Sequence, residues 1–212
     1  MPRPGQNIEQ ALLRSGRQLY AERGAQGLSV RALAEHAGVT ASMFHYHFKN
    51  KDEFLRQLLQ SVYEEMFEKL SDGAQKAGPT FTRLRAALRV VAGFVRDNAA
   101  VLGRVLTDAA SGQQVAIEFM RSNAPRHLKV LLALMDEAQQ EGALVNAAPM
   151  QRFIFVMSAV AMPLVIVPGV LAVGLAPELI GEGLRDQVMS DAAIDQRIEF
   201  ALKAIAAPRR RT

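Results

Sequence analysis

The sequence predicts an all-α protein with an N-terminal three-helix head, which contains a helix-turn-helix, and a larger C-terminal helical bundle. Three observations predict this class. Apolar residues recur at helical spacing, and we find no run that alternates between apolar and polar residues as a half-buried strand would. Half of the 212 residues are hydrophobic, enough for a substantial core. Two short helical patterns flank a glycine between Ser29 and Lys51. We therefore expect two domains, residues 1–52 and residues 53–212.

The first short helix is expected over residues 30–37, where four apolar residues share one face at the spacing i, i+3, i+4, i+7. These residues are Val30, Leu33, Ala34 and Ala37. Ser29 can cap the helix by accepting a hydrogen bond from a free backbone N–H. Gly38 suits the left-handed residue that ends such a helix, because a side chain with a Cβ atom resists that conformation.

The second short helix begins near Thr40, which can cap it. A rotation of about 100° per residue places Ala41, Phe44 and Phe48 on one face, which we expect to be buried. The opposite side carries Ser42, Met43, His45 and Tyr46. Aromatic and polar tips of this kind suit base edges and phosphates in a nucleic-acid groove. The alternative is a solvated face whose aromatic residues bind nothing.

Charge is distributed unevenly along the chain. Residues 1–51 contain seven Lys and Arg against three Asp and Glu, which gives them a formal charge of +4. Residues 52–212 contain eighteen of each kind, so their formal charge is zero. The entire positive excess therefore lies in the segment with the helix-turn-helix, where a polyanion would bind. The C-terminal Arg209, Arg210 and Arg211 are more simply explained as a solubilising tail.

Helical patterns continue through the rest of the chain. Asn50 can cap a long helix that runs from about Lys51 into residues 71–76. The next helix begins at Thr80 and has a strong apolar stripe of Phe81, Leu84, Leu88, Val91 and Val95. A short helix is expected over residues 98–108, and residues 111–142 are expected to be helical with a break near Pro125. The last helix is expected over residues 190–206, with one apolar face of Ile194, Ile198, Ala201, Leu202 and Ile205.

Residues 153–176 contain no charged side chain, and this segment is long enough to span a bilayer. Pro163, Pro168 and Gly169 interrupt it, which is typical of a helix that ends inside a protein. A helix that is apolar on all sides can also be buried in a core or in a dimer interface. We expect burial. The alternative is a membrane-associated helical protein that uses Phe153–Ala176 as an anchor.

Composition and spacing argue against catalysis and metal binding. The chain has no cysteine, which excludes disulfides, thiol catalysis and cysteine-ligated metals. His45 and His47 are two residues apart, about 200° around a helix, so they cannot share one metal ion. We find no nucleophile–base motif and no phosphate-binding glycine loop, and we expect no enzyme activity, no metal and no cofactor. The first ten residues lack the apolar core of a signal peptide, which favours the cytoplasm.

The first seventy residues resemble the tetracycline-repressor (TetR) family of bacterial transcriptional regulators. The resemblance rests on the segments IEQALLRSGRQLYAERGAQGLSV at residues 8–30 and RALAEHAGVTASMFHYHFKNKDEFL at residues 31–55. The chain departs from the family pattern at Ser42, where glycine is frequent, and at His45, where tyrosine is usual. The resemblance implies a DNA-binding regulator of transcription, most simply a repressor. A transcriptional activator is the alternative, because the position of the operator decides between the two.

The resemblance implies contacts with double-stranded DNA from the two short helices and from the start of the helix that follows. The residues concerned are Ser29, Arg31, Thr40, Ala41, Ser42, Met43, His45, Tyr46, His47, Lys49 and Lys51. Among them, Arg31 can reach a phosphate or a guanine edge. Lys51 stands at a helix N-terminus, whose free N–H groups also favour a phosphate.

The resemblance also implies a homodimer, in which Met150–Val167 and Ala192–Ile205 form a four-helix interface with the same segments of a second copy. The alternative is a helix pair within one chain. A dimer would read a palindromic operator whose half-sites lie about 34–36 Å, or a multiple of this, apart.

Members of the family commonly hold a small molecule in the helical body, which releases them from DNA. The candidate ligand-binding residues here are Phe119, Met120, Arg121, Asn123, His127, Phe155, Met157 and Met162. Methionine adapts to irregular cavities, but apolar residues of this kind more often belong to an ordinary core.

Overall fold

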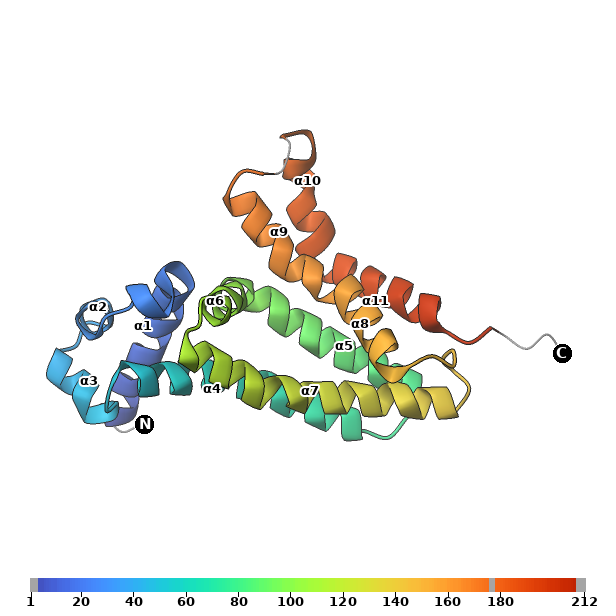
Figure 1. Cartoon of the computed structure of the whole chain (residues 1–212), viewed down its shortest axis with the longest axis horizontal. Coiled ribbons are helices and arrows are strands. Elements are labelled where there is room, and N and C mark those ends of the chain that lie inside the picture. Colours follow the sequence, from blue (N-terminus) through green and yellow to red (C-terminus); the bar gives the residue numbers. More distant parts are fainter. Residues whose placement is uncertain (1–3, 176–177, 209–212) are drawn as a thin grey trace. The chain divides into compact units, whose positions relative to one another are not determined.

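The computed structural model describes residues 4–175 and 178–208, and the side chains of residues 7–175 and 183–208. Within these residues the chain forms eleven α-helices and no strand, and an isolated bridge joins Leu144 to Ala206 (Figure 1). The helices are α1 (Pro4–Gly27), α2 (Val30–His36), α3 (Ala41–His47), α4 (Lys51–Gln75), α5 (Thr80–Asp97), α6 (Ala99–Ala110), α7 (Gln114–Gln140), α8 (Pro149–Val160), α9 (Met162–Ala172), α10 (Glu178–Met189) and α11 (Asp191–Ile205). The predicted all-α class, with an N-terminal helix-turn-helix head and a C-terminal helical domain, is confirmed.

The chain divides into two compact units. The first contains residues 1–64 and 100–123, and the second contains residues 65–99 and 124–212. The first unit thus combines the head with α6 and the beginning of α7, which come much later in the sequence. The predicted domain boundary at residue 52 stays a prediction.

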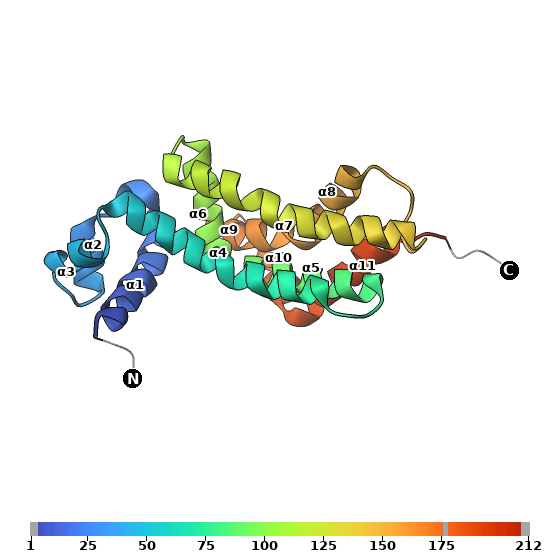
Figure 2. The ribbon, with the colours of Figure 1, turned by 90° about the horizontal axis from the view of Figure 1, so that it is seen from below.

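The core of the first unit lies where α1, α2 and α3 gather around the N-terminal end of α4 (Figure 2). Phe44 and Phe48 are buried as predicted, and both pack against Phe54 of α4. The three ring centroids are 4.9–5.5 Å apart, at the tilted and edge-on angles that aromatic pairs prefer. The predicted burial of Ala41 is wrong. Ala41 is the first residue of α3 and lies in solvent, because only the next turn of the helix reaches the core.

Helix α5 packs most of its predicted stripe in the second unit, where Leu84, Leu88, Val91 and Val95 are buried and Phe81 is half-buried. Three arginines of α5 form ion pairs with acidic residues of α11. The pairs are Arg85–Glu199, Arg89–Asp195 and Arg96–Asp191. Hydrogen bonding from Arg85 lowers the pKa of Glu199, and hydrogen bonding from Arg96 lowers the pKa of Asp191. The stability that the Glu199 and Asp191 pairs add is therefore complete above the ordinary carboxylate pKa and is lost as the pH falls through the lowered pKa values. Exposed pairs of this kind add little stability each.

Helix α7 continues through Pro125, where a break was predicted. The ring removes the hydrogen bond to the carbonyl four residues earlier, that of Arg121. Arg121 is exposed, so water can take the place of the missing donor. Just before the proline, Asn123 is buried and held by Gln60 and Tyr63 of α4. These hydrogen bonds hold α7 against α4 directly before the proline.

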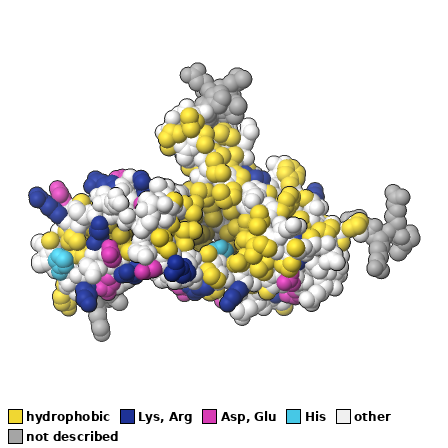
Figure 3. Space-filling model, viewed as in Figure 1, with side chains coloured by type: hydrophobic (Ala, Val, Ile, Leu, Met, Phe, Trp, Pro, Cys, Tyr) yellow, Lys and Arg dark blue, Asp and Glu magenta, His cyan; other side chains and the backbone are white. Residues whose placement is uncertain are grey.

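The uncharged segment forms α8 and α9, and its last predicted residue, Ala176, lies outside the described residues. The combined span Pro149–Ala172 is long and apolar enough to cross a membrane, and 22% of its most apolar window is buried within the chain. Most of the segment is therefore not buried within one chain, and its burial in a dimer interface stays a prediction. Apolar atoms gather on the surface over α8 and over the neighbouring pair of α9 and α10 (Figure 3).

The predicted apolar face of α11 is confirmed, since all five of its residues are buried. Ser190 caps this helix by accepting a hydrogen bond from the N–H of Ala193. The three C-terminal arginines lie outside the described residues.

A buried arginine closes the connection between α7 and α8. The side chain of Arg152 is 1% exposed, and its guanidinium donates to Asp136 at 2.7 Å and to the carbonyl of Ala147 at 2.6 Å. It also donates to Gln139. These bonds tie α8 to the end of α7 through the loop between them.

We predict that Arg152→Ala lowers the free energy of unfolding by about 2–4 kcal/mol, because it removes several hydrogen bonds from a charged group. Arg89→Ala is the matched control, since it deletes an arginine whose ion pair is exposed and should cost about 0–1 kcal/mol. Urea denaturation of both variants measures the difference. Equal losses would show that burial does not strengthen the contacts of Arg152.

Candidate nucleic-acid interface

Two capped helices and a tight turn form the helix-turn-helix. The Ser29 hydroxyl accepts a hydrogen bond from the N–H of Ala32 at the start of α2. The Thr40 hydroxyl accepts one from the N–H of Met43 at the start of α3. Both caps were predicted, and each satisfies a backbone donor that the first turn of a helix leaves free.

The turn between the two helices is a Schellman motif. Gly38 has φ +69°, its N–H donates to the carbonyl of Glu35, and the N–H of Val39 donates to the carbonyl of Ala34. A Cβ atom at Gly38 would meet no neighbour within 4 Å. Its backbone conformation, and not crowding, is therefore the reason for glycine.

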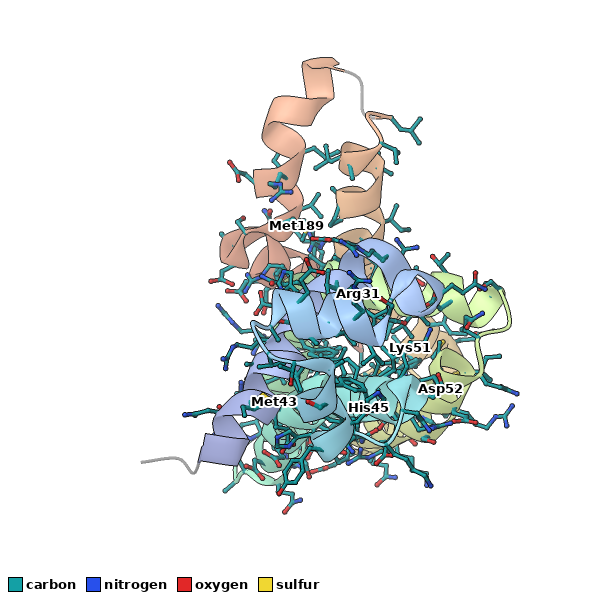
Figure 4. The ribbon with its side chains drawn as sticks, turned by 90° about the vertical axis from the view of Figure 1, so that its left-hand side faces the viewer. Arg31, Met43, His45, Lys51, Asp52 and Met189 are labelled. Carbon is teal, nitrogen blue, oxygen red and sulfur yellow. The ribbon has the colours of Figure 1, made fainter. Side chains whose placement is uncertain are left out.

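The outer face of α3 is open to solvent. Tyr46 is 85% exposed and Met43 is 42% exposed, and Ser42 and His45 also lie in solvent. Figure 4 views the molecule from the side of α2 and α3, and Arg31, Met43 and His45 lie on the near side. Side chains from two helices are thus presented together, because Phe44 and Phe48 hold the opposite face of α3 against the core.

The remaining predicted contact residues differ in their exposure and in the partners that they have within the chain. Lys49 is exposed just after α3, and His47 is half-buried with its ring edge-on to Tyr46. The hydroxyls of Ser29 and Thr40 are occupied as caps. Lys51 is half-buried, and its Nζ donates to the carbonyl of Ala25 at 2.9 Å. The structure therefore gives Lys51 an internal partner that the sequence did not indicate.

The predicted ligand-binding residues fall into both units. Phe119, Met120, Arg121 and Asn123 belong to the first unit, and His127, Phe155, Met157 and Met162 belong to the second. Phe119 lines a surface pocket of 340 Å³ between α4 and α7. A larger pocket of 490 Å³ lies between the end of α4 and α5, lined by residues such as Lys76, Arg83 and Val90 that were not predicted. The role of all eight predicted residues stays a prediction.

Asn123 has partners that the sequence could not reveal. Its amide donates to Gln60, and its carbonyl accepts from the hydroxyl of Tyr63 at 2.8 Å. Both partners lie on α4, about sixty positions earlier in the chain.

Among the described residues, the structure brings together no group of three or more histidine, aspartate and glutamate side chains that could hold a metal ion.

Comparison with known proteins places this geometry among bacterial regulators. Residues 12–58 match the sequence model described as bacterial regulatory proteins, tetR family. The chain is 30% identical over 87 residues to an uncharacterized HTH-type transcriptional regulator of Haemophilus influenzae, covering 41% of this chain and 46% of that protein. It is 28% identical over 102 residues to the nucleoid occlusion factor SlmA of Yersinia pestis, covering 48% and 51%. The matches thus span about half the length of these curated relatives.

Solved structures share the fold over almost the whole chain. A TetR-family transcriptional regulator of Agrobacterium tumefaciens aligns with a TM-score of 0.71 at 14% identity, covering 96% of this chain and 100% of the other. One from Marinobacter aquaeolei aligns with a TM-score of 0.68 at 16% identity, covering 96% and 97%. At these identities the likeness concerns the fold alone.

We predict that Gly38→Ala lowers the free energy of unfolding by about 1–2 kcal/mol, because alanine resists a positive φ. Gly73→Ala is the matched control. Gly73 lies in α4, and an added Cβ atom also meets no neighbour within 4 Å. There alanine should be neutral or stabilise by up to about 1 kcal/mol. Urea denaturation of both variants measures the difference, and an unchanged Gly38→Ala protein would contradict the backbone explanation.

Proposed function

Because the chain belongs to the TetR family of bacterial transcriptional regulators, we propose that it acts as a repressor, which binds a palindromic operator as a homodimer and is released by a small-molecule ligand. The observation that carries the proposal is the outer face of α3. This helix of seven residues buries two phenylalanines and presents polar and aromatic tips to solvent. Such a face is of the size and chemistry that the major groove admits.

The proposed DNA contacts are the eleven residues predicted from the sequence. Arg31 and Lys49 supply charge for phosphates or guanine edges, and Tyr46 and His45 supply hydrogen-bonding rings. Met43 has no hydrogen-bond donor and can only touch a thymine methyl group or a sugar. Ser29 and Thr40 remain within reach of phosphates at the two helix starts, where free N–H groups also favour anions.

The proposed homodimer uses the exposed apolar face of α8 and α11. Ile154 is 56% exposed and Phe200 is 59% exposed, on two helices that pack against each other. Phe155 and Met162 of the uncharged segment are exposed as well. Exposed apolar surface of this kind marks a protein or membrane contact. A second copy is favoured, because one short recognition helix reads only a few base pairs and two-fold symmetry doubles the site.

Release by a ligand requires the helical body to favour different conformers with and without it. Coupling of about 1–3 kcal/mol between the ligand site and the DNA site changes the affinity for the operator about 5–150-fold. The candidate ligand-binding residues proposed above remain the starting point for that site. Repression is distinguished from activation by a reporter gene under the native promoter, whose expression should rise when the chain is removed.

We predict that Arg31→Ala and Tyr46→Ala each weaken binding to specific DNA by about 1–3 kcal/mol, because each removes a direct contact. Mobility-shift titration on an operator selected in vitro measures the change. Arg89→Ala removes the same charge from the body and should leave the affinity within about twofold. Unchanged binding by both head variants would overturn the contact assignment.

We predict that Ile154→Glu and Phe200→Glu each convert the dimer into a monomer, because a carboxylate would have to be buried without a partner. Sedimentation velocity measures the oligomeric state. Leu106→Glu on α6 is the control, since Leu106 is an exposed apolar residue of the first unit, and it should leave the dimer intact. A wild-type chain that is monomeric in solution would contradict the dimer. A wild-type chain that needs detergent to stay in solution would favour the membrane anchor.

A further inference from the structure

Ala25 lies at the point where α1 gives way to the helix-turn-helix. Gly24 departs from helical geometry with φ 67° and ψ −176°, and it kinks the end of α1. Ala25 follows it and is buried, four positions before the Ser29 cap of α2. The direction in which the chain leaves this kink therefore determines where α2 and α3 begin.

Helix α6 holds this kink from one side. The carboxylate of Asp108 is buried and accepts a hydrogen bond from the N–H of Ala25 at 2.9 Å. A Cβ atom on Gly24 would come within 2.8 Å of the Arg104 side chain and 2.9 Å of the Asp108 carboxylate. Arg104 also donates to the carbonyl of Glu22 at 2.9 Å. Position 24 therefore favours glycine for two reasons, its positive φ and the close approach of these two side chains of α6.

Helix α4 holds the same residue from the other side. Lys51, the first residue of α4, donates from Nζ to the carbonyl of Ala25 at 2.9 Å. Both backbone polar groups of Ala25 are therefore bound by side chains, one from α6 and one from α4. Buried backbone groups are usually satisfied within secondary structure, so two long-range side-chain partners on one residue are unusual.

Tyr20 adds to the same junction. It is buried, and burial together with the neighbouring Asp108 carboxylate raises the pKa of its hydroxyl. The hydroxyl therefore stays neutral beside the carboxylate at any physiological pH. Tyr20 of α1 and Ala25 at the kink thus both lie near the Asp108 carboxylate, and the hydrogen bond to it comes from Ala25.

We propose that Asp108 and Lys51 are positioning residues for DNA recognition, which act through Ala25 and fix the direction of the helix-turn-helix relative to α6 and α4. The inference rests on the proposed function, a dimer that reads two half-sites. It reassigns Lys51, which the sequence places among the DNA contacts, to an internal role. A hydrogen bond weakens when its donor and acceptor move apart by a few tenths of an ångström. A shift of α6 therefore either moves the start of α2 with it or breaks the bond between Asp108 and Ala25.

A positioning residue and a contact residue have different consequences for DNA binding. If Lys51 contacts a phosphate, its removal lowers the slope of log affinity against log salt by about one and leaves the preferred half-site spacing unchanged. If Lys51 positions the head, its removal leaves the salt slope unchanged and weakens the preference for one spacing. The same spacing test applies to Asp108, whose charge could only repel a phosphate.

The experiment uses the full chain and a palindrome selected in vitro by the wild-type protein. Affinities are measured for this palindrome and for duplexes with one or two base pairs inserted between the half-sites, at several salt concentrations. Each inserted base pair rotates one half-site by about 34–36° relative to the other. We expect Asp108→Ala and Lys51→Met to reduce the wild-type preference for the selected spacing about fivefold or more, with unchanged salt slopes.

Matched variants control for loss of structure. Asp108→Asn keeps an oxygen that can accept from Ala25, and Lys51→Arg keeps a donor, so both should retain most of the spacing preference. Thr107→Ala alters an exposed neighbour on α6 and should behave as wild type. Amide hydrogen exchange reads the contact directly, and the N–H of Ala25 should exchange faster in Asp108→Ala. If Asp108→Ala does not fold, Lys51→Met decides the question.

The outcomes separate the two proposals. A wild-type chain that selects no palindrome refutes the proposed function, and this inference falls with it. A wild-type chain that selects one, together with folded variants that keep its spacing preference, refutes the positioning role alone. A salt slope that drops by about one in Lys51→Met, with the spacing preference intact, restores Lys51 as a DNA contact.

Discussion

The attachment of α3 to the core through Phe44 and Phe48 is the contact on which the rest of the candidate interface depends. A helix of seven residues is not stable by itself in water, because the cost of its first turn is not recovered over so short a length. Burial of two phenylalanines against Phe54 supplies the missing free energy, on the order of 1.5–3 kcal/mol for each ring. The same contact determines which side of α3 faces outward. One face of this short helix packs against the core, and the opposite face carries the candidate contact residues.

The second unit is stabilised by different means. Helix α5 buries an apolar stripe and forms three ion pairs with α11, and the buried Arg152 binds the loop before α8. Helices α8 and α9 nevertheless leave much of their apolar surface uncovered in a single chain. The second unit thus leaves one apolar face exposed to solvent. The proposed homodimer would cover that face.

The junction at Ala25 shows how a residue that contacts no ligand can matter for recognition. The kink at Gly24 brings the backbone to α6 and to the first residue of α4, and side chains of both helices bind it. None of these residues lies on the outer face of α3. Their effect would be on the direction of that face, and so on how two copies meet two half-sites.

The sequence by itself determined the helix-turn-helix and most of the helix boundaries. Caps at Ser29 and Thr40, the positive φ at Gly38 and the faces of α5 and α11 follow from local rules, which depend on residues within a few positions of one another. Tertiary structure decided what depends on partners far away in the chain. It left Ala41 in solvent, carried α7 through Pro125 beside contacts from α4, and left most of the uncharged segment uncovered within one chain. It also turned Lys51 inward to Ala25 and placed Asp108 beside the same residue. Spacing along one helix predicts which residues share a face, but only the packed chain determines what that face meets.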